Sequence, residues 1–300
     1  MVTPAPPRSR QGNRVTALRW ARILRRLGHR ARLSSDYDGR EADLLVALHA
    51  RRSAPAVERF ATDLYRDLGR SRRARRALER AARIVVLQPR ALTELPERLH
   101  SRTRVIFQSV RAGRRGRAAR GRFDVCVLGH LRAVKDPFRA ALAARLLPPE
   151  SRVRVVQAGA ALEPGMERRA RAEEARNRRY RYRGEIERPR ALALLARSRL
   201  LVLSSRLEGG ANALSEAIAL GVPVLASAIP GSIGILGEDY PGLFPCGDTR
   251  RLAALLGRAE SDPGFYRELA RRCRRLRALV DPARELRSWK NLLAELAPRG

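Results

Sequence analysis

Two glutamates, Glu208 and Glu216, stand with seven residues between them directly after an apolar run. Eight steps of helix rise about 12 Å and return to nearly the same face. Carboxylates only accept hydrogen bonds, so a pair with this spacing can hold hydroxyls at both ends of one extended, polyhydroxylated ligand. The intervening turn, Gly209 to Asn212, offers backbone N–H groups of Gly210, Ala211 and Asn212 at a helix start, where anions are favoured. Two sugars joined by a diphosphate would satisfy all of these features.

The elements that must position these residues form one predicted βαβ unit, LLVLSSRLEGGANALSEAIALGVPVLAS over residues 200–227. The apolar run 200–203 predicts a buried parallel strand, a helix follows to about Leu220, and a second strand covers 222–226. A surface crossover with two solvated glutamates fits the same spacing. The Gly-Gly pair directly after Glu208, where a strand must feed a helix tightly, favours the ligand.

A second candidate segment, residues 129–137, follows a strand predicted over 123–128 and contains His130, Arg132 and Lys135. Of the 63 lysines and arginines in the chain, all but Lys135 and Lys290 are arginine. Where composition favours arginine everywhere, a retained lysine indicates that a compact point charge is needed. The alternative is an ordinary surface lysine.

The first half of the chain predicts a similar arrangement. A short strand ends near Val2, and a polar loop leads to a helix over 14–27, so Gly12, Asn13 and Arg14 would lie at a helix start that can bind an anion. Strands are predicted over 30–33 and 44–48, and the second is followed by further candidate residues at its carboxyl end, where doubly wound folds bind ligands. These are His49, Arg51 and Arg52. An ordinary βα turn and a structural histidine are the alternatives.

Further alternation of strands and helices predicts an α/β protein with two units. The expected domains are 1–110, a linker over 111–122 that is rich in Gly and Arg, 123–275, and a closing segment 276–300 that returns to the first domain. Short strands are expected over 84–87, 105–107, 153–157 and 180–186, and helices over 91–95, 166–177, 189–196 and 249–260. Residues 229–234, with Pro230 and three more turn-forming residues, predict a flexible loop that closes on a ligand.

Composition excludes several classes of protein. A formal net charge of +33 suggests nucleic acid, but the arginines are spread throughout and aromatic residues make up only 5% of the chain, so only nonspecific polyanion binding is expected. Three dispersed cysteines suggest neither a disulfide framework nor a zinc site, and no metal is expected. No apolar run approaches the ~20 residues of a membrane span and no signal peptide is visible, so a cytoplasmic location is expected.

The Glu-x7-Glu pattern with the following Gly-Val-Pro-Val resembles the signature of glycosyltransferase family 4. That resemblance implies the GT-B fold, with two Rossmann-like domains around a cleft, and a nucleotide-sugar donor. It places Glu208 at the donor hexose and Glu216 at the nucleotide ribose. It also places Lys135 at the donor diphosphate, with His130 in the position of the family's arginine and Arg132 close enough to substitute for it. The backbone at Gly184 and Ile186 would border the nucleobase, and no cofactor is implied.

Several blocks are similar to a narrower group, the selenosugar synthases of selenoneine-type biosynthesis. They are VTPAPPRSRQGNRVTALRWA, LLVALHARRSA, TDLYRDL, GHLRAVKDPFRAAL and EGGANALSEAIALGVPVLAS. This resemblance implies that selenophosphate is joined to the sugar of UDP-N-acetylglucosamine or UDP-glucose, with the cations of the first half holding the selenophosphate. The N-terminal domain is expected to be shortened, because its first strand is nearly absent and the apolar strand and Gly-containing loop expected between Phe60 and Thr62 are missing. Two alternatives remain: a family 4 enzyme with a hydroxyl acceptor, and a non-catalytic basic protein that binds nucleic acid.

Overall fold

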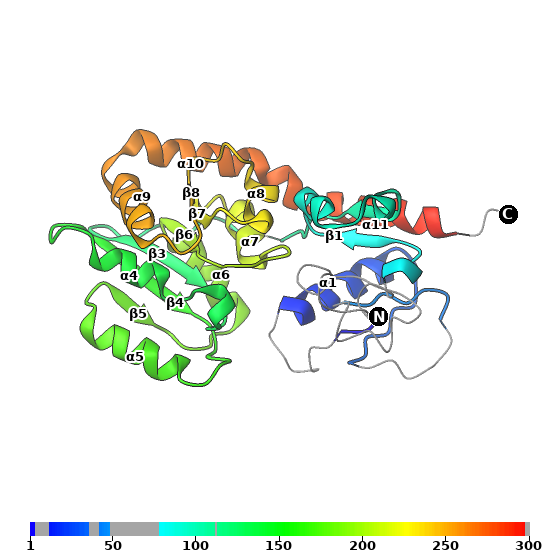
Figure 1. The fold of residues 1–300 in the computed structure, drawn as a ribbon, viewed down its shortest axis with the longest axis horizontal. Coiled ribbons are helices and arrows are strands. Elements are labelled where there is room, and N and C mark those ends of the chain that lie inside the picture. The colour runs from blue at the N-terminus through cyan, green and yellow to red at the C-terminus, as the bar shows by residue number, and fades with distance from the viewer. Residues whose placement is uncertain (4–11, 36–41, 49–77, 112, 298–300) are drawn as a thin grey trace. The chain divides into compact units, whose positions relative to one another are not determined.

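The computed structural model describes residues 1–3, 12–35, 42–48, 78–111 and 113–297. The chain divides into two compact units (Figure 1). The first consists of Met1–Ser109 with Pro282–Gly300, and the second of Val110–Asp281. Each unit is an α/β structure whose strands pair in parallel. The predicted α/β class with parallel sheets is therefore confirmed.

The second unit is built on a six-stranded parallel sheet with the strand order β5-β4-β3-β6-β7-β8. Its strands are β3 (Phe123–Leu128), β4 (Val153–Ala158), β5 (Tyr180–Tyr182), β6 (Leu200–Leu203), β7 (Val224–Ser227) and β8 (Leu243–Phe244). All four residues of β6 and of β7 are buried, as expected of central strands covered on both faces. The chain adds β4 and β5 on one side of β3 and β6 to β8 on the other, so the winding direction reverses between β3 and β6.

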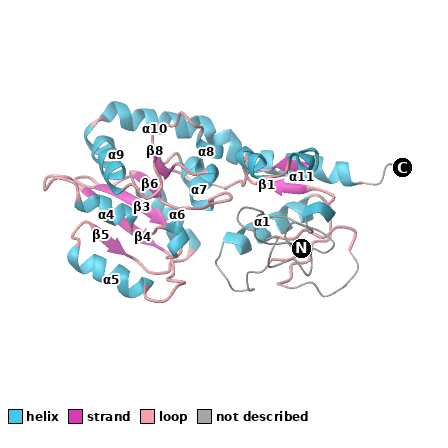
Figure 2. Ribbon diagram, viewed as in Figure 1, coloured by secondary structure: helices cyan, strands magenta, loops and turns pink. Residues whose placement is uncertain are grey.

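Helices line this sheet (Figure 2). They are α4 (Arg139–Arg145), α5 (Met166–Arg176), α6 (Arg188–Arg197), α7 (Asn212–Leu220), α8 (Pro230–Leu236), α9 (Thr249–Ser261) and α10 (Pro263–Arg275), with 3₁₀ turns η3 (Ala133–Lys135) and η4 (Leu276–Val280). The helix α7 buries six of its nine residues and ends at Gly221, whose φ of 69° is the left-handed conformation that terminates helices.

The first unit contains α1 (Gly12–Arg26), the parallel pair β1 (Ile84–Val86) and β2 (Thr103–Val105), the 3₁₀ turns η1 (Pro89–Glu94) and η2 (Glu97–Arg102), and α11 (Pro282–Leu296). Val2 forms isolated parallel bridges with Ser34 and Ala47. The rings of Trp20 and Trp289 pack edge to face with centroids 4.8 Å apart, which joins α1 to α11 in one core.

A buried carboxylate strengthens this junction. Glu285 of α11 accepts hydrogen bonds from Trp20 Nε1 at 2.9 Å, from Arg19 Nε at 3.1 Å and from the Ser109 backbone N–H at 3.0 Å. Because a charge that is shielded from water needs such partners, the bonds fix where α11 lies on this unit. Residues from Pro282 onward thus belong to the first unit, whereas η4 belongs to the second.

Most elements of the second unit lie where the sequence predicts them. Several predictions in both units are wrong. The segment 229–234 is not a loop: Pro230 occupies the first turn of α8, where proline is well tolerated, and Ile235 and Leu236 are buried. The strands predicted over 30–33 and 44–48 are reduced to the bridges at Ser34 and Ala47. The strand predicted over 105–107 ends at Val105, that over 180–186 ends at Tyr182, and the helix predicted over 91–95 is the 3₁₀ turn η1.

Residues 113–122, from the segment predicted as a linker, are attached to the second unit. The Gly116 N–H donates to the Ala196 carbonyl at 3.1 Å, and Arg115 Nη2 donates to the Ser198 carbonyl at 2.9 Å. Both acceptors lie where α6 ends. One backbone and one side-chain hydrogen bond thus hold residues 115 and 116 against the end of α6, which composition did not predict.

Candidate functional site

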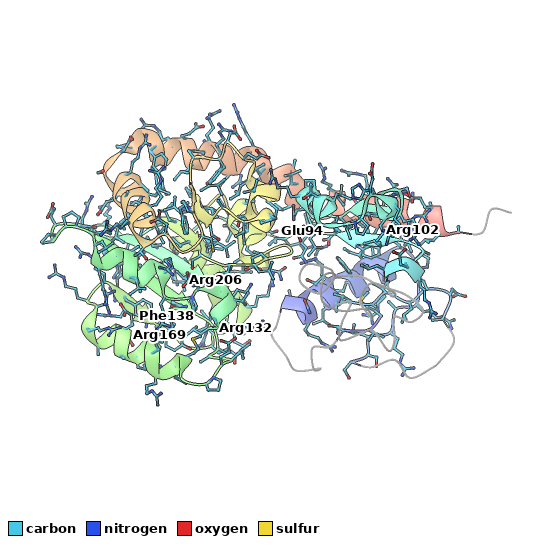
Figure 3. The ribbon with its side chains drawn as sticks, viewed as in Figure 1. Glu94, Arg102, Arg132, Phe138, Arg169 and Arg206 are labelled. Atoms are coloured by element: carbon cyan, nitrogen blue, oxygen red, sulfur yellow. The ribbon has the colours of Figure 1, made fainter. Side chains whose placement is uncertain are left out.

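The candidate site of the second unit forms at the carboxyl ends of β3 and β6. Ligands of open α/β sheets bind where the winding direction reverses, because the two loops there diverge to opposite faces. The loop after β3 carries residues 129–136 and the loop after β6 carries residues 204–211. They are joined by a backbone hydrogen bond of 2.8 Å from the Arg206 N–H to the Val134 carbonyl. Arg132 and Arg206, labelled in Figure 3, come from these two loops.

Lys135 and Glu208 form an ion pair between these loops. The Lys135 Nζ donates to Glu208 Oε1, and the Ser205 hydroxyl donates to the same oxygen at 2.6 Å. The Lys135 side chain is 30% exposed and that of Glu208 only 8%. No described residue donates a hydrogen bond to the second oxygen, Oε2, so that oxygen can still accept from a ligand.

Helix α8 approaches the backbone of Glu208 closely at Gly231. A methyl group built on Gly231 would lie 2.1 Å from the Glu208 carbonyl oxygen, which no real side chain tolerates. The backbone of Gly231 does not have a positive φ, so its conformation does not require glycine. Glycine is required because there is no space for a side chain. Gly231 therefore allows α8 to pack directly against the backbone of Glu208.

Glu216 lies on α7, and its carboxylate pairs with Arg188 at the start of α6 (Nη2 to Oε1, 2.8 Å). The Glu216 side chain is 10% exposed and that of Arg188 44%. Because α7 begins at Asn212, Glu208 precedes the helix and the two glutamates do not share one helical face, as their spacing alone had suggested. Ala211 caps α7 without a side-chain hydrogen bond, since a methyl group cannot accept one.

His130 and Arg132 hold different positions in the loop after β3. The Ala160 N–H donates to Nδ1 of His130 at 3.1 Å, so Nδ1 is the acceptor and the proton of the neutral ring is on Nε2. Arg132 has a half-exposed side chain directed to Glu163 at 3.9 Å, and Glu163 in turn accepts from the Ala133 N–H at 2.7 Å. Arg132 is thus less firmly held than Lys135.

Three glycines meet at the carboxyl ends of β3, β4 and β5. A methyl group on Gly159 would lie 2.0 Å from the Gly129 carbonyl oxygen, and the Gly159 N–H donates to the Gly184 carbonyl at 2.8 Å. Tyr182 Oη donates to the Gly159 carbonyl at 2.8 Å, and burial raises the pKa of Tyr182, so this phenol stays a donor. Ile186 is half-buried and lies in the loop that leads to α6, two residues before Arg188.

The thiol of Cys126, in the middle of β3, is buried and does not act as a nucleophile at this site. It is fully shielded from solvent, and burial raises the pKa of this thiol far above its ordinary value. A thiol must ionise to act as a nucleophile. The nucleophile of any reaction here is therefore not Cys126.

The candidate residues of the first half lie in the first unit. Gly12, Asn13 and Arg14 form the first turn of α1, which begins two residues earlier than predicted. The buried Nε of Arg14 has no hydrogen-bond partner in the described part of the chain. His49, Arg51 and Arg52 lie outside the described residues.

Within the described residues, no group of three or more His, Cys, Asp or Glu side chains is placed to hold a metal ion. No helix among them is long and apolar enough to cross a membrane.

Three further residues of this site were not among those predicted from the sequence: Arg188, Ser205 and Gly231. Arg188 is one of many arginines, so its type carries no signal. Ser205 is the second residue after a predicted strand, which is a usable signal because residues at the carboxyl ends of parallel strands lie at the edge of the sheet where ligands bind. The role of Gly231 depends on a close approach between segments distant in sequence, which only the fold shows.

Solved structures similar to this chain include sucrose-phosphate synthase from Thermosynechococcus elongatus, with 22% sequence identity and a TM-score of 0.63. The match covers 77% of this chain, which spans 62% of the length of that protein. HepE from Anabaena, solved in complex with UDP, has 16% identity and a TM-score of 0.68, with 83% of this chain and 78% of that one covered. The pneumococcal O-GlcNAc transferase GtfA, solved with UDP and GlcNAc, has 16% identity and a TM-score of 0.59, with 73% and 46% covered.

These similarities show the fold, which is the α/β fold of the GT-B glycosyltransferases. The sequence profile of the family described as Glycosyl transferases group 1 matches residues 114–276, which is more than half of the 300-residue chain. The matched range contains Lys135, Glu208, Glu216 and the loops that position them. The chain belongs to the group 1 glycosyl transferases.

Proposed function

We propose that this protein is a glycosyltransferase that takes its sugar from a UDP-sugar bound at the carboxyl ends of β3 and β6. The observation that carries the proposal is the ion pair between Lys135 and Glu208 at the point where the winding of the sheet reverses. It sets a compact cation beside an acceptor-only group, which suits a sugar attached to a diphosphate. Two of the similar structures were solved with UDP, which agrees with this donor.

Each candidate residue has a distinct part in the proposed donor site. Glu208 Oε2 accepts from a hydroxyl of the hexose, and Glu216 accepts from the ribose. The Lys135 ammonium neutralises the diphosphate, and Arg132 together with Nε2–H of His130 adds further donors. The backbone at Gly184 and Ile186 borders the nucleobase, and the N–H groups of Gly210 to Asn212 face the phosphates.

The proposed mechanism depends on electrostatic stabilisation of the leaving group. As the bond between the anomeric carbon and the diphosphate oxygen breaks, UDP leaves with the electron pair and negative charge grows on that oxygen. A fixed cation beside this oxygen stabilises the developing charge without the reorganisation that water would need. In this proposal Lys135 supplies the cation, and no divalent metal takes part.

We infer that the acceptor is selenophosphate, because the blocks that resemble the selenosugar synthases extend over both halves of the sequence. The selenium lone pair attacks the anomeric carbon, a carbon–selenium bond forms, and the selenium keeps its phosphoryl group. A soft nucleophile that is already anionic needs no general base. The first turn of α1 supports an anionic acceptor, since Arg14 Nε is unpaired there within the described residues and guanidinium suits phosphate oxygens. His49, Arg51 and Arg52 are proposed to bind the same anion.

The test is a UDP-release assay on the purified full chain. UDP-N-acetylglucosamine and UDP-glucose are each incubated with selenophosphate, with inorganic phosphate, or with a set of sugar alcohols, and UDP and the glycosyl product are measured. UDP release together with a selenium-containing sugar product supports the proposal. Release with alcohols alone would identify a family member with a hydroxyl acceptor. No release from any donor, by folded protein, would overturn the assignment of activity.

A further inference from the structure

Two consecutive buried serines, Ser204 and Ser205, follow β6 directly and contact both partners of the Lys135–Glu208 pair. In an extended chain the side chains of neighbouring residues point to opposite sides. We propose that these serines are positioning residues: Ser204 fixes the backbone that carries Lys135, and Ser205 fixes the carboxylate of Glu208. The functional part of this inference rests on the proposed function, whereas its structural part does not.

Ser204 acts on the turn that follows Lys135. Its hydroxyl donates to the Asp136 carbonyl at 2.9 Å and lies 3.4 Å from the Lys135 carbonyl. Asp136 has φ 43° and ψ 54°, and it is the only residue other than glycine with positive φ in the described part of the chain. Such a conformation is unfavourable and persists only where the surroundings impose it.

Two side chains impose this turn. One is Ser204, and the other is Arg139, whose Nε donates to the Asp136 carboxylate at 2.8 Å while its Nη1 donates to Thr249 at 2.6 Å. Because Lys135 immediately precedes the strained residue, its side chain can leave the loop in the observed direction only while the turn is kept. By holding this turn, Ser204 helps to fix the position of the Lys135 ammonium group.

Ser205 acts on the carboxylate of Glu208. Its hydroxyl donates to Glu208 Oε1 at 2.6 Å, and Ser227 donates to the Ser205 carbonyl at 2.5 Å. Lys135 and Ser205 thus share Oε1, and Oε2 accepts no hydrogen bond from the described residues. This arrangement fixes the rotamer of Glu208 and keeps one of its oxygens available for a sugar hydroxyl.

A buried serine hydroxyl forms a hydrogen bond somewhere in any protein, so the test must separate positioning from ordinary stability. Ser198 provides the matched control, since it is also buried, precedes the same strand at its opposite end, and donates to Leu194 O at 2.9 Å. The variants are Ser204→Ala, Ser205→Ala and Ser198→Ala, with Ser204→Cys and Ser205→Cys as size-preserving versions whose thiol is a weak donor.

The first measurement does not need activity. Lysine labelled with ¹⁵N and ¹³C gives two side-chain signals, from Lys135 and Lys290, because the chain has no other lysine. We expect Ser204 and Ser205 variants to shift the Nζ signal of Lys135 and leave that of Lys290, in the first unit, in place. Ser198→Ala should shift neither. An unchanged Lys135 signal in folded Ser204 and Ser205 variants would overturn the proposal.

The second measurement is a double-mutant cycle on UDP-sugar turnover. Loss of one hydrogen bond to a charged group predicts that Ser205→Ala lowers kcat by about tenfold or more. In a Glu208→Gln background the same substitution should have little further effect, because Ser205 acts through that carboxylate. Additive losses would overturn the positioning role of Ser205. If the wild-type protein releases no UDP, the proposed function fails, while the lysine signal still decides the structural part.

Discussion

The ammonium group of Lys135 meets the carboxylate of Glu208 although 73 positions separate them in the chain. Each residue lies in a different βα loop, and the loops meet because β3 and β6 are neighbours in the sheet. The pair is therefore a product of topology, formed at the place where parallel sheets bind ligands. In the proposed donor complex, the diphosphate contacts Lys135 while the hexose contacts Glu208.

Replacing Lys135 tests the proposed cation directly. Lys135→Met removes the charge beside the leaving diphosphate, and we expect kcat to fall by about 10² to 10³-fold, as when one transition-state donor is lost. Lys135→Arg should recover only part of this rate, because a planar guanidinium does not replace a compact ammonium. Lys290→Met, which removes the only other lysine, is the control and should keep the rate of the wild type. A Lys135→Met variant with normal kcat would exclude this role.

Removal of metal ions tests the statement that cationic side chains suffice. Since the proposal assigns the diphosphate charge to Lys135, His130 and Arg132, turnover in excess EDTA should equal turnover in added Mg²⁺ or Mn²⁺. The measurement is the initial rate of UDP release after exhaustive dialysis against the chelator. A rate that collapses in EDTA and returns with a divalent cation would show that a metal takes part.

Replacing Glu216 tests the nucleotide end of the donor site. Glu216→Ala removes the acceptor proposed for the ribose hydroxyls, and hydrogen bonds to a charged group contribute about 1.5–3 kcal/mol, so UDP should bind about 10- to 100-fold more weakly. Titration calorimetry with UDP gives the affinity without any acceptor. The thermal shift produced by UDP should shrink in parallel.

The matched control for this variant is Glu150→Ala, which removes an exposed carboxylate from the same unit. It should bind UDP like the wild type. Arg188→Ala is informative as well, because Arg188 pairs with Glu216 and its loss should alter UDP affinity through the position of that carboxylate. Equal UDP affinity in Glu216→Ala and in the wild type would remove Glu216 from the site.

Local sequence signals predicted much of the second unit. Residues 123–128 and 200–203 are the strands β3 and β6 with the predicted bounds, because an apolar run that is flanked by turn residues has few other structures available. The prediction from turn-forming residues was wrong at residues 229–234. Pro230 and the glycines there indicate a loop, but they belong to the short helix α8, which Pro230 begins. In the first unit, bridges at Ser34 and Ala47 replace two predicted strands, because a strand is defined by its partners as much as by its own residues.

The candidate site was predictable only where the type or the spacing of its residues was unusual. Lys135 stood out among arginines, and the two glutamates stood out by their spacing. Arg188 did not, since arginine is everywhere in this chain, and its pairing with Glu216 depends on where α6 and α7 lie. Contacts of this kind arise from packing between distant segments, which periodicity and spacing do not encode.

The acidity of Glu295 gives a prediction for the stability of the first unit. Hydrogen bonds from Arg104 and then Arg83 lower the pKa of this exposed carboxyl from its ordinary 4.5 to about 2. A lowered pKa stabilises the fold above the unfolded value, and that stabilisation is lost as pH falls through the folded value. Glu295→Gln should therefore be less stable than the wild type at pH 7, and the difference should shrink between about pH 4.5 and pH 2.

Tryptophan fluorescence in denaturant measures the stability of the first unit. Both tryptophans of the chain, Trp20 and Trp289, pack together in that unit. Glu150→Gln, in the second unit, should leave the fluorescence transition unchanged at each pH. A difference between Glu295→Gln and the wild type that stays constant from pH 7 to pH 2.5 would contradict the assignment.

The close approach of Gly231 to Glu208 gives the sharpest structural prediction. In Gly231→Ala the new methyl group would meet the Glu208 carbonyl oxygen at 2.1 Å, so either α8 or the loop after β6 must move. Overpacking of this kind costs about 1–3 kcal/mol of unfolding free energy, and the moved loop carries Glu208 away from Lys135. We expect a lower melting temperature together with weaker UDP-sugar binding.

Gly257→Ala separates this effect from the mere addition of a methyl group. Gly257 lies inside α9, where the methyl would make an ordinary contact of 3.6 Å with Leu147, and alanine favours a helix over glycine by about 1 kcal/mol. That variant should be at least as stable as the wild type and bind the donor normally. If Gly231→Ala matched it in both melting temperature and UDP-sugar affinity, α8 would not support Glu208, and the carboxylate would have to be held by Ser205 and Lys135 alone.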